Sequence, residues 1–108
     1  AKLRKGTVDF MEQNKAIGLL EVQANVAAIV GLDAMVKAAS VRLVHVERRL
    51  GGRLVTVVID GDVSDVTAAI EAGRTAAAAV GNVKLSEVIA NPHPEIRKFI
   101  YTDPLDEA

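Results

Sequence analysis

Residues 54–81 read LVTVVIDGDVSDVTAAIEAGRTAAAAVG, and this stretch decides the fold. Residues 54–60 are mostly β-branched, so they predict a strand. Residues 65–80 predict a helix, with Ser64 as the expected N-cap and Gly81 as the expected C′ glycine. The alanines of that helix have little side-chain bulk, so we expect a sheet or a second helix to approach it closely.

The residues before this stretch predict a hairpin. A Gly-Gly pair supplies the turn, which places the loop within residues 49–53. Residues 41–47 alternate in character and predict the partner strand. A regular alternation places Leu43 and His45 on one face of that strand and Val44 on the other.

The first strand and helix follow from the same kind of pattern. Residues 16–22, AIGLLEV, form an almost continuous apolar run, which is typical of a strand covered on both faces. Asn25 is the expected N-cap of a helix over residues 26–39. The apolar stripe expected along that helix consists of Ile29, Leu32, Val36 and Ala39.

Residues 83–89 predict a fourth strand, which Asn91-Pro92 ends, and residues 94–100 predict a short last helix. The order β-α-β-β-α-β predicts an α+β, ferredoxin-like fold, a four-stranded antiparallel sheet with two long helices on one face. The strands are apolar on both faces, so the last helix or another subunit must cover the second face. We expect a polar extension at 1–15, one domain at 16–100 and an acidic tail at 101–108.

Composition narrows the classes of function. The chain has 108 residues, which suits one domain, and its core must be aliphatic because only 3% of the residues are aromatic. A net charge of −1 gives no sign of nucleic-acid or membrane-surface binding. There is no cysteine, which excludes disulfides and thiolate chemistry, and no apolar run is long enough for a signal peptide or a membrane span.

Two residue groups invite a chemical interpretation. Glu47 is placed to orient His45 as a general base, but no nucleophile accompanies them, which favours an ordinary or interface histidine. Asp60 and Asp62 offer two metal ligands without a third, which favours a turn whose acids stabilise the next helix. The sequence therefore predicts no catalytic residue, no metal site and no cofactor, and hence no enzyme.

Five blocks in unbroken order resemble the bacterial microcompartment shell domain, and together they span most of residues 16–100. The resemblance implies cyclic hexamers of the single-domain type. The hexamers tile edge to edge into a shell around enzymes in the bacterial cytoplasm, with a central pore for metabolites. The implied partners are copies of the chain, other shell proteins and encapsulated enzymes, with no nucleic acid and no membrane. The blocks are AIGLLEVQ (16–23), LDAMVKAAS (32–40), RLVTVVIDGDVSDV (53–66), AAIEAGRTAAAAVG (68–81) and VIANPHPEI (88–96).

The same resemblance assigns residues to the edge where hexamers meet. Lys37 corresponds to the family's edge lysine. A second edge element contains Asn91, Pro92 and His93. The family commonly has Pro-Arg-Pro-His there, so Ala90 and Asn91 replace a proline and the edge arginine. Ser40 also stands where an asparagine is usual, and a short amide in place of a guanidinium implies weaker or rearranged edge contacts.

The pore loop is assigned to Leu50, Gly51, Gly52 and Arg53, about one residue longer than the family's Gly-Ser-Gly hairpin. Arg48 and Arg49 precede it. Arginines that converge on a rotation axis attract anions. The alternative, which stays open at this point, is that these arginines lie along the hexamer faces or pair with Glu47.

A different class of function also fits the topology. A regulatory, small-ligand-binding module can use the same ferredoxin-like fold, but the sequence contains no recognisable ligand site for it. The mass of the protein in solution separates the two hypotheses, because a shell subunit forms a hexamer or a larger assembly.

Overall fold

The computed structural model describes residues 16–101, and the expectations for 1–15 and 102–108 lie outside the described residues. The four strands pair antiparallel in the order β2-β3-β1-β4, which confirms the ferredoxin-like α+β fold. The elements are β1 (Ala16–Gln23), α2 (Asn25–Ala38), β2 (Arg42–Arg49), a 3₁₀ turn (Leu50–Gly52), β3 (Leu54–Gly61), α3 (Val63–Ala78), β4 (Asn82–Ala90) and α4 (Pro94–Tyr101).

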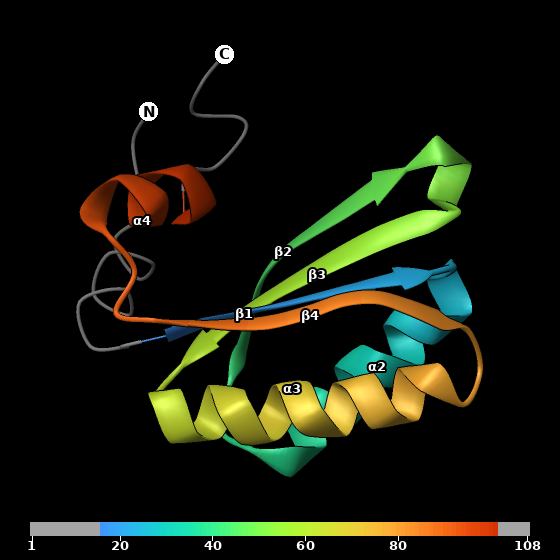
Figure 1. Cartoon of the computed structure of the whole chain (residues 1–108), viewed down its shortest axis with the longest axis horizontal. Coiled ribbons are helices and arrows are strands. Elements are labelled where there is room, and N and C mark those ends of the chain that lie inside the picture. The colour runs from blue at the N-terminus through green and yellow to red at the C-terminus, as the bar shows by residue number, and fades with distance from the viewer. Residues whose placement is uncertain (1–15, 102–108) are drawn as a thin grey trace.

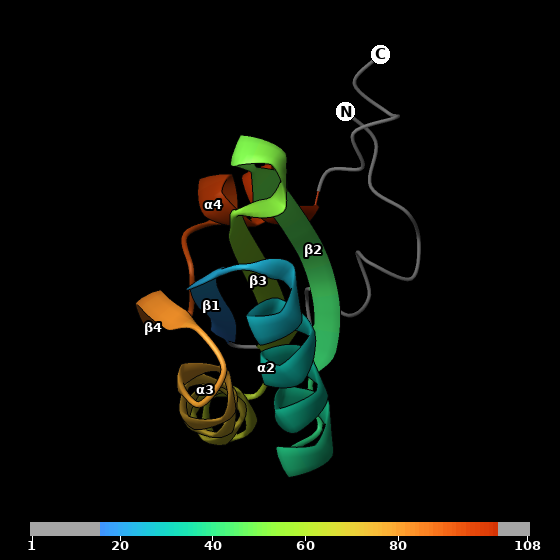
Figure 2. The ribbon, with the colours of Figure 1, turned by 90° about the vertical axis from the view of Figure 1, so that its right-hand side faces the viewer.

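The molecule has three layers. Helices α2 and α3 lie side by side on one face of the sheet, and α4 lies on the opposite side of the sheet (Figures 1 and 2). The hydrophobic core fills the space between the sheet and the two long helices. Its largest fully buried side chains are Ile59, Leu20, Met35, Val22, Val55, Val57 and Val66.

Small residues bring the two long helices together. A Cβ atom added to Gly73 would lie 2.5 Å from Cγ of Met35 and 3.2 Å from the carbonyl oxygen of Gly31. A Cβ atom added to Gly31 would lie 2.9 Å from Leu20. Both glycines are therefore required by close approach, and the expectation that the alanine-rich helix has a close neighbour is confirmed.

The stripe expected along α2 does not face the core. The residues that α2 buries are Ala27, Ala28, Gly31 and Met35, and only Leu32 and Ala39 of the expected set pack partly against the core. Ile29 and Val36 are 65% and 46% exposed. The expectation was wrong because α2 faces the sheet and α3 through its buried residues, among them Gly31 and Met35, which leaves Ile29 and Val36 on the solvent side of the helix.

Both expected N-caps were also wrong. Asn25 is the first residue of α2, and Ala24 takes the cap position by accepting a bond from the Ala28 amide at 3.1 Å. In α3 the cap is Asp62, whose backbone carbonyl accepts from Val66 at 2.8 Å, and Ser64 lies inside the first turn. Neither cap residue makes a side-chain hydrogen bond.

Gly81 follows α3 for a different reason from the one expected. Its amide donates to the carbonyl of Ala77 at 2.9 Å, which closes the helix end, but its φ is not in the left-handed range. A Cβ atom on Gly81 would overlap the carbonyl oxygen of Gln23. A glycine is needed there because the chain passes directly against the end of β1.

A β-bulge changes the faces of β2. Leu43 pairs with Ile59 and His45 pairs with Val58, so Val44 is an extra residue on β2. Ile59 and Val58 are consecutive residues of β3 and point to opposite faces. Leu43 and His45 therefore lie on opposite faces of the sheet, and the expectation that they share one was wrong.

Candidate functional site

The β2–β3 loop is built from three consecutive residues with left-handed backbone. The φ angles of Leu50, Gly51 and Gly52 are 54°, 66° and 87°, and the Arg53 amide closes the turn on the carbonyl of Leu50 at 3.3 Å. Glycine adopts this conformation readily, whereas a bulky residue rarely does. Leu50 is also 71% exposed. The loop therefore holds an exposed leucine in a strained conformation.

The two glycines of the loop have different surroundings. No atom lies within 4 Å of a Cβ added to Gly51. A Cβ added to Gly52 would lie 2.9 Å from Nδ2 of Asn25. The side chain of Asn25 thus supports the loop from the start of α2. Sequence reasoning missed this role because no local pattern relates two positions so far apart in the chain.

Positive charge concentrates around the loop. Arg48 and Arg49 end β2, Arg53 follows the turn, and all three are exposed. Glu47, the partner considered for them, lies 3.5 Å from Nε2 of His45. Among the described side chains, no ion pair neutralises these arginines. Their charges therefore remain available at the tip of the hairpin.

The other candidate residues lie at the opposite end of the sheet. Lys37, in the last turn of α2, forms an ion pair with Asp33 at 2.8 Å, and its side chain is 73% exposed. Ala16 of β1 pairs with Ala90 on one side and Gly61 on the other, so β4 and β3 end at the same end of the sheet, away from the loop (Figure 1). The structure thus separates the expected edge residues from the expected pore residues.

The segment between β4 and α4 has a defined conformation. Asn91 adopts a left-handed φ of 52°, which asparagine tolerates better than most residues. Pro92 is buried, and His93 is exposed. Nδ1 of His93 accepts a hydrogen bond from the Glu95 amide at 3.1 Å. Asn91 therefore forms the turn that ends the strand, and His93 forms the start of α4.

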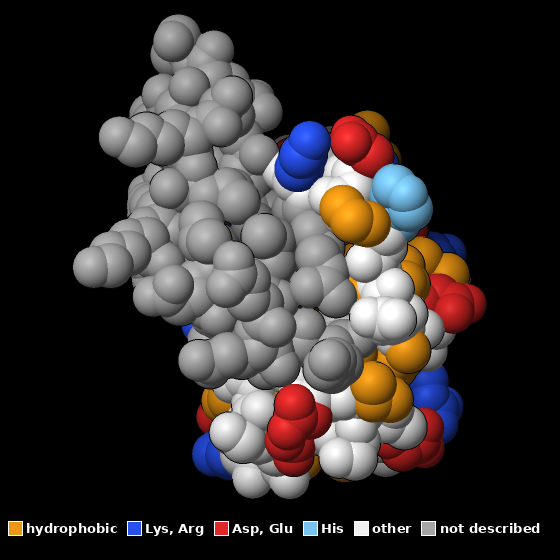
Figure 3. Space-filling model, turned by 90° about the vertical axis from the view of Figure 1, so that its left-hand side faces the viewer, with side chains coloured by type: hydrophobic (Ala, Val, Ile, Leu, Met, Phe, Trp, Pro, Cys, Tyr) orange, Lys and Arg blue, Asp and Glu red, His pale blue; other side chains and the backbone are white. Residues whose placement is uncertain are grey.

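The surface at this end of the molecule carries charges of both signs. Acidic, basic and histidine side chains alternate with hydrophobic ones on the face shown in Figure 3. The described side chains of this face therefore include both signs of charge, in contrast to the three arginines at the loop. This mixed character fits a surface that makes specific contacts with another protein better than one that attracts nucleic acid.

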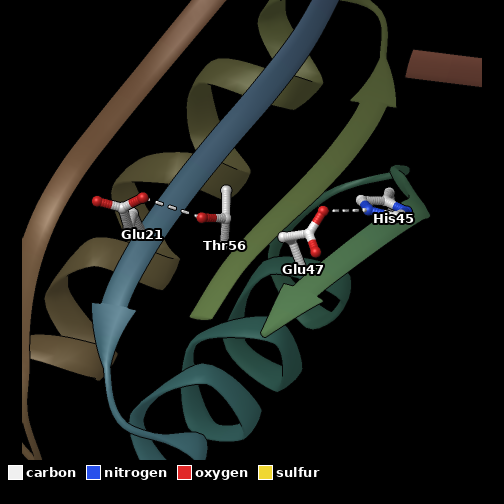
Figure 4. A network of polar contacts seen from close by, with 4 residues as sticks. All are labelled: Glu21, His45, Glu47 and Thr56. Atoms are coloured by element: carbon white, nitrogen blue, oxygen red, sulfur yellow. Dashed lines mark hydrogen bonds and ion pairs between the residues drawn. The ribbon is translucent and has the colours of Figure 1, made fainter. Parts of the chain in front are cut away.

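A polar network on the sheet face opposite α2 and α3 does not form a catalytic site. His45 contacts Glu47 along β2, but the hydroxyl of Thr56 donates to Glu21 at 3.0 Å and points away from the histidine (Figure 4). A histidine and a carboxylate without a nucleophile or a substrate cavity lack the arrangement that acyl or proton transfer requires. The network consists of one contact within β2 and one hydrogen bond between β3 and β1.

The two aspartates considered as metal ligands are separated by their environments. Asp60 lies within β3, is fully buried and accepts a hydrogen bond from Nη2 of Arg42 at 3.2 Å. Asp62 is exposed before α3. Only Asp62 thus fits the expected turn of helix-stabilising acids. In the part of the chain that the structure describes, no three potential ligands lie close enough to hold a metal ion.

Comparison with known proteins decides the family. The sequence pattern of the family described as BMC domain matches residues 16–92. The chain belongs to the BMC domain family. Its role is therefore that of a microcompartment shell subunit, a structural protein rather than an enzyme, as the resemblance of its five blocks implied. In residues 16–101, no helix has the length and apolar character to cross a membrane.

Two curated relatives and one solved structure give the extent of the similarity. The microcompartment shell protein PduA of Citrobacter freundii is 47% identical over 88 residues, which cover 82% of this chain and 94% of PduA. EutM of Escherichia coli K12 is 42% identical, covering 78% and 86%. A microcompartments protein from Desulfitobacterium hafniense DCB superposes with a TM-score of 0.71 at 36% identity. That match covers 81% of this BMC domain protein but only 47% of the Desulfitobacterium chain.

Proposed function

We propose that this BMC domain protein forms cyclic hexamers that tile edge to edge into a bacterial microcompartment shell, with the β2–β3 loops around a central pore. The observation that carries the proposal is the separation of the two candidate sites. Leu50–Gly52 lies at one end of the sheet, and Asn91–His93 lies at the other (Figure 1). A wedge-shaped subunit of a ring needs this arrangement, with one end at the axis and one at the rim.

Helix α2 runs between the two ends. Asn25, its first residue, contacts Gly52 of the loop, and Lys37 lies in its last turn. The rise of an α-helix places these two residues about 18 Å apart. This distance supports the assignment of Lys37 to the lateral edge, because the proposed ring has the loop at its axis and the lateral edge far from that axis.

Exposed apolar side chains support self-association. Val26 and Ile29 of α2 are each 65% exposed, and Val36 is 46% exposed beyond the Asp33–Lys37 ion pair. Large apolar side chains that gather on one side of an exposed helix favour a protein interface. We assign this surface to the contact between neighbouring subunits of the ring, which removes it from water.

We also propose that the domain extends to α4. The family match ends at residue 92, but α4 contacts β2 and continues directly from the element that contains His93. The inferred domain is therefore residues 16–100. Copies of the chain, other shell proteins and encapsulated enzymes are the proposed partners.

The assembly is tested by mass and by electron microscopy. The wild-type protein should have the mass of a hexamer and form extended sheets. Lys37→Ala should leave the hexamer intact and reduce sheet formation, whereas Lys84→Ala, which changes an exposed lysine of β4, should assemble as the wild type does. A monodisperse monomer at micromolar concentration would contradict the proposal, and an unchanged Lys37→Ala would remove this lysine from the edge.

The charge of the loop predicts the class of molecule that passes. Six copies of Arg48, Arg49 and Arg53 around a narrow aperture attract small anions, because low-dielectric walls focus the field. Arg53→Glu should lower the flux of a small anionic metabolite into assembled shells, and Lys84→Glu should leave it unchanged. Unchanged flux with intact Arg53→Glu hexamers would show that Arg53 does not control the field of the pore.

A further inference from the structure

His93 caps helix α4 with two acceptors. Its carbonyl accepts the Ile96 amide at 2.9 Å, and Nδ1 of its ring accepts the Glu95 amide at 3.1 Å. These two bonds satisfy amides of the first helical turn, which have no partner inside the helix. A ring nitrogen that accepts a hydrogen bond carries no proton, so the neutral ring has its proton on Nε2. The cap therefore fixes both the tautomer and the direction of the imidazole.

The remaining ring nitrogen is a donor directed away from the helix. His93 is exposed, and no hydrogen bond or ion pair with another described side chain engages Nε2. Pro92 is buried on one side of His93, and Pro94 begins α4 on the other. Two prolines restrict the backbone on either side. A donor that is already oriented loses little conformational entropy when it binds an acceptor.

Asn91 is less suited to replace the arginine usual at its position. Its left-handed φ of 52° makes it the turn residue after β4, and its side chain is short. We infer that Nε2–H of His93 is the specific hydrogen-bond donor of the lateral edge and binds a carbonyl or carboxylate oxygen of a neighbouring hexamer of this chain. The inference rests on the proposed tiling, because it needs two hexamers side by side.

Two substitutions separate the donor role from the capping role. The side-chain oxygen of asparagine reaches the position of Nδ1, so His93→Asn keeps a capping acceptor and removes the outer donor. The amide of glutamine reaches the position of Nε2, so His93→Gln keeps the outer donor and weakens the cap. Each variant therefore keeps one of the two properties that the wild-type histidine combines, the capping acceptor in His93→Asn and the outer donor in His93→Gln.

The test measures two quantities for each variant. Native mass spectrometry gives the fraction of hexamer, and electron microscopy gives the lowest protein concentration at which sheets form. Both variants should remain hexameric. His93→Asn should raise the threshold about tenfold or more, since one lost hydrogen bond weakens a contact by up to about tenfold and each hexamer repeats the contact. His93→Gln should stay within about threefold of the wild type.

The outcomes distinguish the inference from the proposal beneath it. Normal sheets from His93→Asn would overturn the donor role, whether or not His93→Gln assembles. Loss of sheets in both variants, with folded hexamers, would also overturn it, because the restored donor would then be insufficient. Wild-type hexamers that form no sheets would instead refute the proposed tiling. If His93→Gln does not fold, the capped variant His93→Asn still decides between donor and cap.

Discussion

On the face of the sheet that α2 and α3 cover, Leu20 and Val57 are sealed from solvent, whereas the next residues of the same strands place Glu21 and Thr56 on the opposite face. The first pair belongs to the hydrophobic core, and the second pair is a partly buried hydrogen bond. Within each of these strands, neighbouring residues thus belong in turn to the hydrophobic core and to the opposite face of the sheet. Substitutions on the helix-covered face should change the free energy of unfolding most, and those on the opposite face should change it less.

The opposite face is not uniform along its length. Near the loop it carries polar residues, and near α4 it buries Ile17, Val58 and Asp60. The buried carboxylate of Asp60 lies on this face with Arg42 as a partner. The buried end of the opposite face is therefore an exception to this comparison, because a buried charge pair, like the buried side chains of Ile17 and Val58, is as sensitive to substitution as the core.

The largest effect is expected on the helix-covered face. Ile59→Ala removes a fully buried side chain from the core and should lower the free energy of unfolding by about 4 kcal/mol. The matched change Glu47→Ala, on the opposite face of the neighbouring strand, should cost less than about 0.5 kcal/mol. Chemical denaturation of both variants checks the difference. Equal losses would show that the two faces contribute equally.

The exception gives the second prediction. Arg42→Met leaves the carboxylate of Asp60 fully buried without the Arg42 guanidinium and should lower the free energy of unfolding by about 3 kcal/mol. Lys37→Met, which breaks an exposed pair with Asp33, should cost less than about 1 kcal/mol. Thermal unfolding of the two variants provides the measurement. If the two variants were equally stable, the buried ion pair of Asp60 would contribute no more to the free energy of unfolding than the exposed pair of Asp33.

A smaller effect is expected in the polar part of the opposite face. Thr56→Val keeps the shape of the side chain and removes its hydrogen bond to Glu21, which should cost about 0.5–1 kcal/mol. A double-mutant cycle with Glu21→Gln isolates the coupling between the two side chains. A coupling energy near zero would mean that the hydrogen bond to Glu21 adds no stability and that Thr56 contributes only through its preference for strands.

The smallest effect concerns the solvent side of α3, outside both faces. A hydrogen bond and the charge of Arg74 lower the pKa of the Glu71 carboxyl. A carboxyl with a lowered folded-state pKa adds stability above its unfolded pKa, and this stability is lost as the pH falls through the folded value. Both side chains are exposed, so the change is small. Glu71→Gln should lower Tm slightly at about pH 7, and the difference from the wild type should shrink as the pH falls through the folded-state pKa of Glu71.

The order of the elements and the family were predictable because they depend on patterns within continuous segments. The β-branched run of β3, the alanines of α3 and the Gly-Gly loop each define their structure locally. Five such blocks in order were sufficient for the family. The strands and helices found in residues 16–101 confirm this part of the sequence analysis.

The features that could not be predicted depend on distances between segments. Ile29 and Val36 lie on the solvent side because α2 packs on α3 through Gly31 and Met35, and the sequence of α2 alone does not show which side of the helix meets its neighbours. The extra residue at Val44 is an ordinary strand former, so nothing marked the bulge that places His45 on the other face. The contact of Asn25 with Gly52 joins two elements that are remote in sequence. The edge assignments of Lys37 and His93 remain predictions, since they concern a second hexamer.

The open surroundings of Gly51 have a consequence for protein engineering. No neighbouring atom lies within 4 Å of an added Cβ atom, so the surroundings leave room there, and the left-handed φ of 66° is the remaining constraint on a residue at this position. Exposed loop tips of this kind accept inserted peptides with little loss of stability. An epitope or a metal-binding sequence inserted at Gly51 would leave the sheet and helices unchanged. In an assembled ring, six copies of the insert would meet, and a purification tag placed there would double as a plug.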